Sequence, residues 1–343
     1  GICLSAREAC GGRILSTSVF LNELRRKDIR VWAEGDRLRC SAPDGVLSAE
    51  LSETIRQRKE EILAFLRIAD TVAQQHPAIV PLRAKGNLTP VYAVSGHNGD
   101  VFAYVDLVRH LGERQPFFGL HPPGLDGHSK PLTRVEDLAA YFASQIRSFH
   151  SSGPAIIAGY CAGGAIAFEL ARQLEKSGMQ IRFLALFGCP YPANYRFIAR
   201  LPYWMGRILL HLRTVMKLTS MREASGYLKQ RLARRIETAR TEGRPMSEDV
   251  DSVMKFQLEQ ATIKAVRRYV PSRFPGRLIQ ILPVRGWMKS NMGATRWRSV
   301  VMNAEEVFGP DTCNPATMLL DPDAPEMAAL FSRYRDLDAR QER

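Results

Sequence analysis

The chain has 343 residues, long for one domain, and its 45% apolar content suffices for a sizeable buried core. No run of 18 or more apolar residues occurs, which argues against a transmembrane helix. The net charge of +13 is unevenly spread, because residues 194–245 carry twelve Lys and Arg against three Glu. No nucleic-acid-binding motif accompanies this excess, so an acidic protein or a phosphate-bearing substrate explains it at least as well.

The cysteine pattern and the first residues bear on the compartment. The six cysteines lack CxxC pairs, which is typical of reduced thiols in the cytoplasm; they are Cys3, Cys10, Cys40, Cys161, Cys189 and Cys313. The chain begins at Gly1 with neither Met nor a long apolar stretch. We interpret this as a truncated start rather than a signal peptide, and we expect a cytoplasmic protein.

The first segment predicts a helix, a hairpin and a second helix. Ser16 precedes an apolar cluster at residues 19–24, as a helix N-cap does. Two short alternating runs flank Gly35-Asp36, which is a hairpin signal. Residues 48–69 follow with helical periodicity; the apolar face comprises Leu51, Ile55, Ile62, Phe65 and Leu66. This small α+β module is close to the lower size limit for independent folding.

Residues 14–69 resemble the TubC-type N-terminal docking domain, which stands at the start of nonribosomal peptide and polyketide synthase subunits. The most specific part is the stretch Trp-x-Glu-Gly-Asp-x-Leu-Arg, from Trp32 to Arg39. The resemblance implies that the module binds a C-terminal peptide of an upstream synthase subunit, by adding a strand to the hairpin edge. A small structural cap without a partner is the alternative.

Residues 70–89 have the Pro- and Gly-punctuated composition of a linker. After them strands and helices alternate; we expect strands at 90–94, 115–120, 154–160 and 181–188, and helices at 101–112, 135–149 and 165–178. This alternation predicts a doubly wound, mostly parallel α/β sheet. A basic, helical segment at about 191–269 interrupts it and indicates a lid. A last strand at 276–284 and a helix at 324–337 close the domain.

The stretch Gly-Tyr-Cys-Ala-Gly-Gly, from Gly159 to Gly164, has the form of a nucleophile elbow with Cys161 at its centre. In such a turn between strand and helix the central residue is strained, and small neighbours relieve clashes. The elbow glycines are Gly159, Gly163 and Gly164. The dipole of the following helix predicts a lowered pKa for the Cys161 thiol, and the amide of Ala162 is half of an expected oxyanion hole. A tight turn around an inert cysteine is the alternative.

Residues 90–340 resemble the type I thioesterase domain, an α/β-hydrolase that releases chains from peptide and polyketide synthases. The residues that carry this are the segments 91–127, 159–174 and 265–282. The resemblance implies that the substrate is an acyl or peptidyl chain on the 4'-phosphopantetheine of a carrier protein, with no cofactor or metal bound by the domain itself. It implies that Cys161 accepts the chain and that Gly96 or His97 supplies the second oxyanion amide. Basic residues of the lid would meet the acidic carrier; we name Arg231, Arg234 and Arg235.

Two members of the family's triad are missing. Gly188 and Cys189 stand where the family has its aspartate, and Asn314 or Pro315 stands where it has its histidine. No histidine follows His211, so the usual order Ser, Asp, His is incomplete. We expect His97 to be the replacement base, oriented by Asp100 or Asp126, although a solvent-exposed or capping role for His97 stays open. His121 and His128 are expected in surface loops.

Three interpretations remain open. Cys161 acts as a nucleophile, in which case cyclisation or transfer to an amine is easier than hydrolysis, because a thiol needs little base assistance whereas water needs a good base. Alternatively, the domain is a degenerate thioesterase that serves as a docking or binding scaffold. A zinc site made by the four side chains of Cys161, Cys189, Cys313 and His97 is the third possibility, without a metal-binding spacing in its favour.

Overall fold

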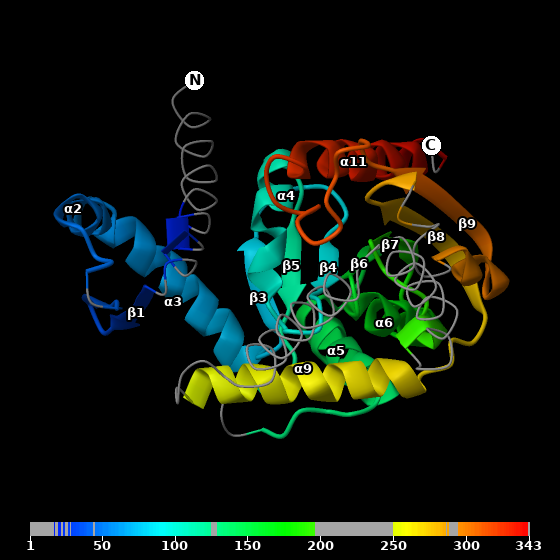
Figure 1. Ribbon diagram of the computed structural model, residues 1–343, viewed down its shortest axis with the longest axis horizontal. Coiled ribbons are helices and arrows are strands. Elements are labelled where there is room, and N and C mark those ends of the chain that lie inside the picture. The colour runs from blue at the N-terminus through cyan, green and yellow to red at the C-terminus, as the bar shows by residue number, and fades with distance from the viewer. Residues whose placement is uncertain are drawn as a thin grey trace, which may run out of the picture.

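The computed structural model describes residues 17, 20–21, 23–24, 27, 29–43, 45–124, 129–195, 250–285, 287 and 294–341. At their centre is a seven-stranded sheet in the order β3-β5-β4-β6-β7-β8-β9, preceded in the chain by a two-stranded hairpin, β1-β2 (Figure 1). Strand β3 is antiparallel to β5, and every other pairing in the large sheet is parallel. The expected α/β class with a mostly parallel sheet, typical of an α/β-hydrolase, is confirmed.

The strands of the large sheet are β3 Ile79–Arg83, β4 Val91–Val94, β5 Phe117–Leu120, β6 Ala155–Tyr160, β7 Ile181–Phe187, β8 Phe274–Leu282 and β9 Val301–Phe308. The helices around it are η1 Val101–Tyr104, α4 Val105–His110, α5 Val135–Phe149, α6 Gly163–Lys176, η2 Pro192–Tyr195, α9 Val250–Arg268, η3 Ala294–Ser299 and α11 Ala324–Gln341. The helices η1, η2 and η3 are of the 3-10 type. Within the described ranges, no helix is both long and apolar enough to cross a membrane.

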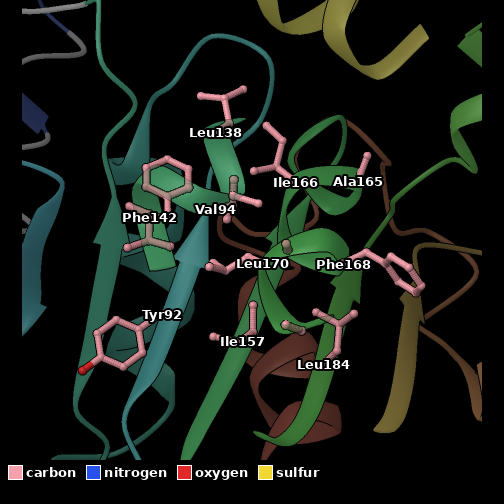
Figure 2. Packing of buried hydrophobic residues seen from close by; sticks show 14 of the residues in the cluster. Tyr92, Val94, Leu138, Phe142, Ile157, Ala165, Ile166, Phe168, Leu170 and Leu184 are labelled. Carbon is pink, nitrogen blue, oxygen red and sulfur yellow. The ribbon is translucent and has the colours of Figure 1, made fainter. Parts of the chain in front are cut away.

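Helices cover both faces of the sheet, so its central strands are apolar on both sides. Tyr92, Val94 and Ile157 point into one core, together with side chains of α5, α6 and α9. Figure 2 shows this core, where Phe142 of α5 and Leu170 of α6 lie over the strands. The intervening strand residues pack against α4 and α11 in a second core. The result is a three-layer structure whose strands all end at the same edge, apart from β3.

The N-terminal module has its own small core. Strands β1 Arg30–Glu34 and β2 Arg37–Ser41 form the predicted hairpin around Gly35 and Asp36. Helix α2, Ala49–Gln57, begins at Ser48, whose side chain accepts a hydrogen bond from the amide of Leu51. The helices and hairpin enclose Leu24, Ile29, Ile55 and Ile62. The first predicted helix, which begins near Ser16, lies largely outside the described residues.

Four expectations about the elements need correction. Residues 48–69 are not one helix, because the chain breaks at Arg58 between α2 and α3, Lys59–Gln75. Residues 70–89 are not a linker, because α3 continues to Gln75 and β3 joins the sheet with Pro81 inside it. The helix expected at 101–112 begins with the 3-10 turn η1. The strand at 276–284 is not the last, because β9 pairs with β8 along the edge of the sheet.

The predicted lid is described only at its two ends. Residues 192–195 form η2 and residues 250–268 form α9, whereas 196–249 lie outside the described residues, and Arg231, Arg234 and Arg235 with them. Helix α9, yellow in Figure 1, passes beside α5. Its buried residues Ala265 and Val266 join the core formed with α6. This end of the expected lid is therefore packed against the domain.

Candidate active site

The strand order places two loops opposite each other. From β4 the chain crosses to β5 on one side, whereas from β6 it crosses to β7 on the other. Strands β4 and β6 are parallel neighbours, with Val94 beside Gly159. In open α/β sheets a crevice forms where neighbouring strands send the chain in opposite directions, and ligands bind there. The loop at residues 95–100 and the elbow at Cys161 both lie at this point.

The backbone of Cys161 has the strained conformation expected of a nucleophile elbow. Its φ of 51° is in the left-handed region, and among the described residues no other non-glycine residue has a positive φ. Its amide donates to the carbonyl of Phe187, and its own carbonyl accepts from Gly164. A non-glycine residue held in this region costs of order 1–3 kcal/mol, so the surrounding contacts must fix it there. The side chain is partly exposed, as a nucleophile's must be.

Close packing explains the three elbow glycines. A methyl group on Gly163 would overlap the carbonyl oxygen of Ser95, and one on Gly164 would overlap the side chain of Cys189. A methyl group on Gly159 would lie 2.7 Å from the Cβ atom of Ala167. Such distances are shorter than real carbon contacts. The elbow therefore depends on glycine at these positions because strand, helix and loop backbones approach one another closely.

Gly96 lies beside the nucleophile. A Cβ atom built on it would be 3.9 Å from Cβ of Cys161 and 3.7 Å from the Tyr160 ring. The loop after β4 thus faces the elbow, in the place where the second oxyanion donor was expected. The first expected donor, the amide of Ala162, lies within hydrogen-bonding reach of the Cys161 sulfur. The expected oxyanion residues are therefore gathered around Cys161.

The prediction of a lowered pKa for Cys161 is wrong. Burial of the thiol raises its pKa, and this outweighs the hydrogen bonds from the Ala162 amide and the Tyr195 hydroxyl, which lower it. The free-energy cost of removing a thiolate from water exceeds the stabilisation that these hydrogen bonds provide. In the resting protein the sulfur therefore carries its proton, and a partner must take that proton when the sulfur reacts.

His97 follows Gly96, and its imidazole contacts the end of the predicted lid. Its Nε2 atom is 3.2 Å from Oε1 of Glu259 in α9. The expected orienter Asp100 has another role, because its carboxylate accepts from the amide of Phe102 and caps η1. The other expected orienter, Asp126, lies outside the described residues, as does His128. The carboxylate beside His97 is thus Glu259, which the sequence analysis missed.

The positions of the missing triad members hold thiol and amide groups. Cys189 is buried under the elbow, with its sulfur 3.3 Å from the carbonyl oxygens of Gly159 and Phe187. Cys313 is buried too, and burial with the nearby Asp323 carboxylate raises its pKa to about 12. Both thiols are therefore protonated at neutral pH, and neither acts as a base.

Residues 314–316, where the resemblance places the family's histidine, are hydrogen-bonded to the elbow. The hydroxyl of Tyr160, the residue before the nucleophile, donates to the carbonyl of Ala316 at 3.0 Å. The Asn314 side chain accepts from the Ala316 amide, and the Asn314 amide donates to Asp323. Asn314 therefore stabilises the loop itself.

The zinc alternative finds no support. Across the described parts of the chain, no group of three or more His, Cys, Asp or Glu side chains is arranged to hold a metal ion. Cys161, Cys189 and Cys313 are free thiols, and so is Cys40 of the hairpin. His121 is placed by its backbone, whose amide donates to the carbonyl of Ala78.

Two nearby side chains were missed by the sequence analysis. Tyr195 of η2 reaches the Cys161 sulfur through its hydroxyl, and Glu259 of α9 reaches His97. Neither residue belongs to a motif. The helices that carry them, η2 and α9, pack against each other, and no local pattern in the sequence signals that packing.

Comparison with known proteins agrees with this geometry. Residues 18–67 match the model of the TubC N-terminal docking domain, and residues 89–247 match that of the thioesterase domain. The chain is 36% identical over 122 residues to "Inactive atromentin synthetase invA6" of Paxillus involutus, which covers 35% of the chain and 13% of that protein. It is 31% identical over 162 residues to "Atromentin synthetase nps3" of Serpula lacrymans var. lacrymans (strain S7.9), which covers 47% of the chain and 17% of that protein.

The chain thus spans less than a fifth of the length of these curated relatives. Among solved structures, it resembles the Vlm2 thioesterase domain with genetically encoded 2,3-diaminopropionic acid bound with a dodecadepsipeptide. The TM-score is 0.52 at 21% identity, over 75% of this chain and 98% of that one. The chain therefore contains a match to the TubC-type docking domain at residues 18–67 and a match to the thioesterase domain at residues 89–247, and it has the fold of solved thioesterase domains with Cys161 in its nucleophile elbow.

Proposed function

We propose that Cys161 accepts an acyl or peptidyl chain from the phosphopantetheine thioester of a carrier protein and passes it on in a peptide or polyketide assembly line. The observation that carries the proposal is the strained, partly exposed Cys161 at the crevice between β4 and β6, with the Ala162 amide on its sulfur. The relatives named as synthetases support the setting. The sequence around Cys161 supplies the nucleophile that such a transfer needs.

The first step is a thioester exchange. The Cys161 sulfur attacks the carbonyl carbon, and the tetrahedral oxyanion receives hydrogen bonds from the Ala162 amide and from the loop at Gly96 and His97. The carbon–sulfur bond to phosphopantetheine then breaks, and the departing thiolate takes up the proton that Cys161 lost. One thioester replaces another, so the step is close to thermoneutral. The active site needs only to orient the reactants and stabilise the oxyanion.

The second step decides the product. Neither Cys189 nor Asn314, at the positions of the missing triad members, offers a base, so His97 would have to activate an attacking water. Water needs a base to attack efficiently, whereas an amine of the substrate attacks with its own lone pair. We therefore propose transfer or cyclisation as the preferred outcome, and slow hydrolysis.

Two partners follow from this proposal. The carrier protein, which is acidic in such systems, would meet the basic segment with Arg231, Arg234 and Arg235. The upstream synthase subunit would bind the N-terminal module by adding a peptide strand to the hairpin, where Trp32 is 46% exposed. A reducing cytoplasm suits the free cysteines of the described residues.

A single-turnover reaction with an acyl-loaded carrier protein tests the proposal. The wild-type chain should release free holo-carrier within the turnover, and Cys161→Ala should not. Cys40→Ala is the matched control, because Cys40 is an exposed thiol of the hairpin that would report unspecific exchange. Equal release by wild type and Cys161→Ala would contradict the proposal. Under multiple-turnover conditions, adding an amine nucleophile should raise the rate of acyl transfer more than raising the pH does.

A degenerate, non-catalytic scaffold is the second candidate. Two observations favour it: the relative invA6 is named inactive, and burial raises the pKa of the Cys161 thiol. In this case the carrier would bind without losing its acyl group. Carrier binding by calorimetry, together with no release in the single-turnover reaction, would decide for the scaffold.

A further inference from the structure

The contact between His97 and Glu259 joins the loop after β4 to helix α9. The Nε2 and Oε1 atoms are 3.2 Å apart, and both side chains are about two-fifths exposed. With Nε2 facing the carboxylate, Nδ1 is the ring nitrogen left to exchange a proton with another group. His97 directly follows Gly96, whose backbone lies against Cys161.

Helix α9 holds Glu259 in a fixed register. Leu258, the preceding residue, is 1% exposed, and Ala265 and Val266 belong to the core that α6 shares. The helix also packs against η2, whose Tyr195 donates to the Cys161 sulfur. Helix α9 therefore contacts His97 through Glu259 and packs against η2, which carries Tyr195.

We propose that Glu259 is the positioning residue that takes the role of the missing aspartate, by orienting the His97 imidazole towards Cys161. This inference rests on the proposed function of Cys161. This arrangement differs from that of the family, in which the aspartate and the histidine both follow the nucleophile along the chain. Here the histidine, His97, lies on the loop after β4, before the nucleophile, and the carboxylate, Glu259, lies on α9.

The proton transfer is balanced within these groups. As the sulfur attacks the thioester carbonyl, its proton moves to Nδ1 of His97, and the Glu259 carboxylate accepts the hydrogen on Nε2 and stabilises the imidazolium. When the bond to phosphopantetheine breaks, the same proton passes from Nδ1 to the departing thiolate. His97 and Glu259 return to their starting states. No oxidant, reductant or metal takes part.

The other ionisable groups near the Cys161 sulfur are Tyr104, Tyr160, Tyr195 and Cys189. On α9 itself, Lys255 lies one turn before Glu259. Burial raises the pKa of the Tyr104 and Tyr160 hydroxyls and of the Cys189 thiol. Those three groups therefore keep their protons through neutral pH. A loss of Cys161 reactivity in Glu259→Gln therefore does not arise from these three groups and points to the contact between His97 and Glu259.

The test measures the rate at which iodoacetamide alkylates Cys161 in the full chain, site-resolved by peptide mass spectrometry, from about pH 6 to about pH 11, which extends past the raised pKa of the thiol. Wild type is compared with Glu259→Gln, Glu259→Asp and His97→Ala. Because an exposed ion pair of this kind is weak, Glu259→Gln should slow alkylation only about two- to fivefold at pH 7. The two rates should converge at high pH, where solvent removes the thiol proton, and Glu259→Asp should restore part of the loss.

Glu326→Gln is the matched control, since it removes the same charge at an exposed position of α11 on the opposite face of the sheet. It should alkylate like wild type. The inference is overturned if Glu259→Gln follows the wild-type profile, or if it slows alkylation equally at every pH, as a mere packing change would.

The proposed function is tested separately, by acyl transfer from the loaded carrier. If alkylation depends on Glu259 and His97 as described but the carrier never loses its acyl group, the positioning inference stands and the proposed function fails. If the acyl group is transferred but Glu259→Gln changes neither the pH profile of alkylation nor the rate of acyl transfer, the proposed function stands and the positioning inference fails.

Discussion

Replacing Gly163 with alanine should disrupt the junction between elbow and loop. The added methyl group would overlap the Ser95 carbonyl oxygen and lie 2.9 Å from both the Ser95 carbonyl carbon and the Val94 oxygen. These are backbone atoms at the end of β4, so no side-chain rotation relieves the clash. The start of α6 or the loop after β4 must move, and either movement separates the two halves of the expected oxyanion hole.

The expected loss of stability follows from two opposing effects. Overpacking typically costs about 1–3 kcal/mol, and a backbone clash lies at the upper end. Alanine gains up to about 1 kcal/mol over glycine inside a helix, but less at a first turn. We expect Gly163→Ala to lower the free energy of unfolding by about 2 kcal/mol. Urea unfolding followed by circular dichroism measures this difference.

Gly96→Ala is the matched control, because its methyl group would meet Tyr160, Asn98 and Cys161 at 3.7–3.9 Å, which is ordinary contact. Its stability should stay within about 0.5 kcal/mol of wild type. Its methyl group lies beside the nucleophile, so alkylation of Cys161 should slow although the fold is intact. If Gly163→Ala is as stable as wild type, or if both variants lose the same free energy, the close approach of loop and elbow is not what requires glycine.

Three further predictions concern other parts of the chain. The pH midpoint of Cys161 alkylation should lie above that of a free thiol, because burial raises the pKa of the Cys161 thiol. Tyr195→Phe should raise this midpoint further, by about one pH unit, because it removes a donor that stabilises the thiolate. A lower midpoint in Tyr195→Phe would refute the contact between Tyr195 and Cys161. Tyr269→Phe removes the hydroxyl that donates to the Glu169 carboxylate at 2.8 Å and should cost about 1–2 kcal/mol in urea unfolding at pH 7. Burial raises the pKa of Glu169, but the hydrogen bonds from Arg172, Gln173 and Tyr269 outweigh it, so the pKa is lowered. The stabilisation by Tyr269 is therefore present above the carboxyl's ordinary pKa and is lost as the pH falls through the lowered value; an unchanged cost in acid would contradict this. Ile62→Ala, at a fully buried position of the docking domain, should destabilise that domain by about 2–5 kcal/mol while Cys161 alkylation stays at the wild-type rate.

The sequence was most informative where patterns are local. Helix α5 begins and ends where its periodicity predicted, at Val135 and Phe149, and the apolar runs of β4, β6 and β7 are buried on both faces as expected of parallel strands. Strand β9 was missed because Asn303, Glu305 and Glu306 give it the polar pattern of an exposed edge. Residues 79–83 were taken for linker because Pro81 is rare in strands, but β3 lies at the sheet edge, where proline is tolerated.

The same distinction applies to the candidate active site. The elbow is a contiguous motif, so Cys161 and its glycines were identifiable from the sequence. Tyr195 and Glu259 were not, because their positions depend on how η2 and α9 pack against each other. The direction of the Cys161 pKa was mispredicted for a related reason. The helix dipole is visible in the sequence, whereas the burial that outweighs it exists only in the folded chain.

Intact-protein mass spectrometry after mixing with an acyl-loaded carrier tests the role of Cys161 most directly. Rapid quenching in acid preserves a thioester on the protein, and peptide mapping locates it. We predict one added acyl mass on the wild-type chain and on Cys40→Ala, mapped to the peptide that contains Cys161, and none on Cys161→Ala. An acyl mass that persists in Cys161→Ala, or a wild-type chain that never gains one while the carrier is bound, would contradict a covalent role for this cysteine.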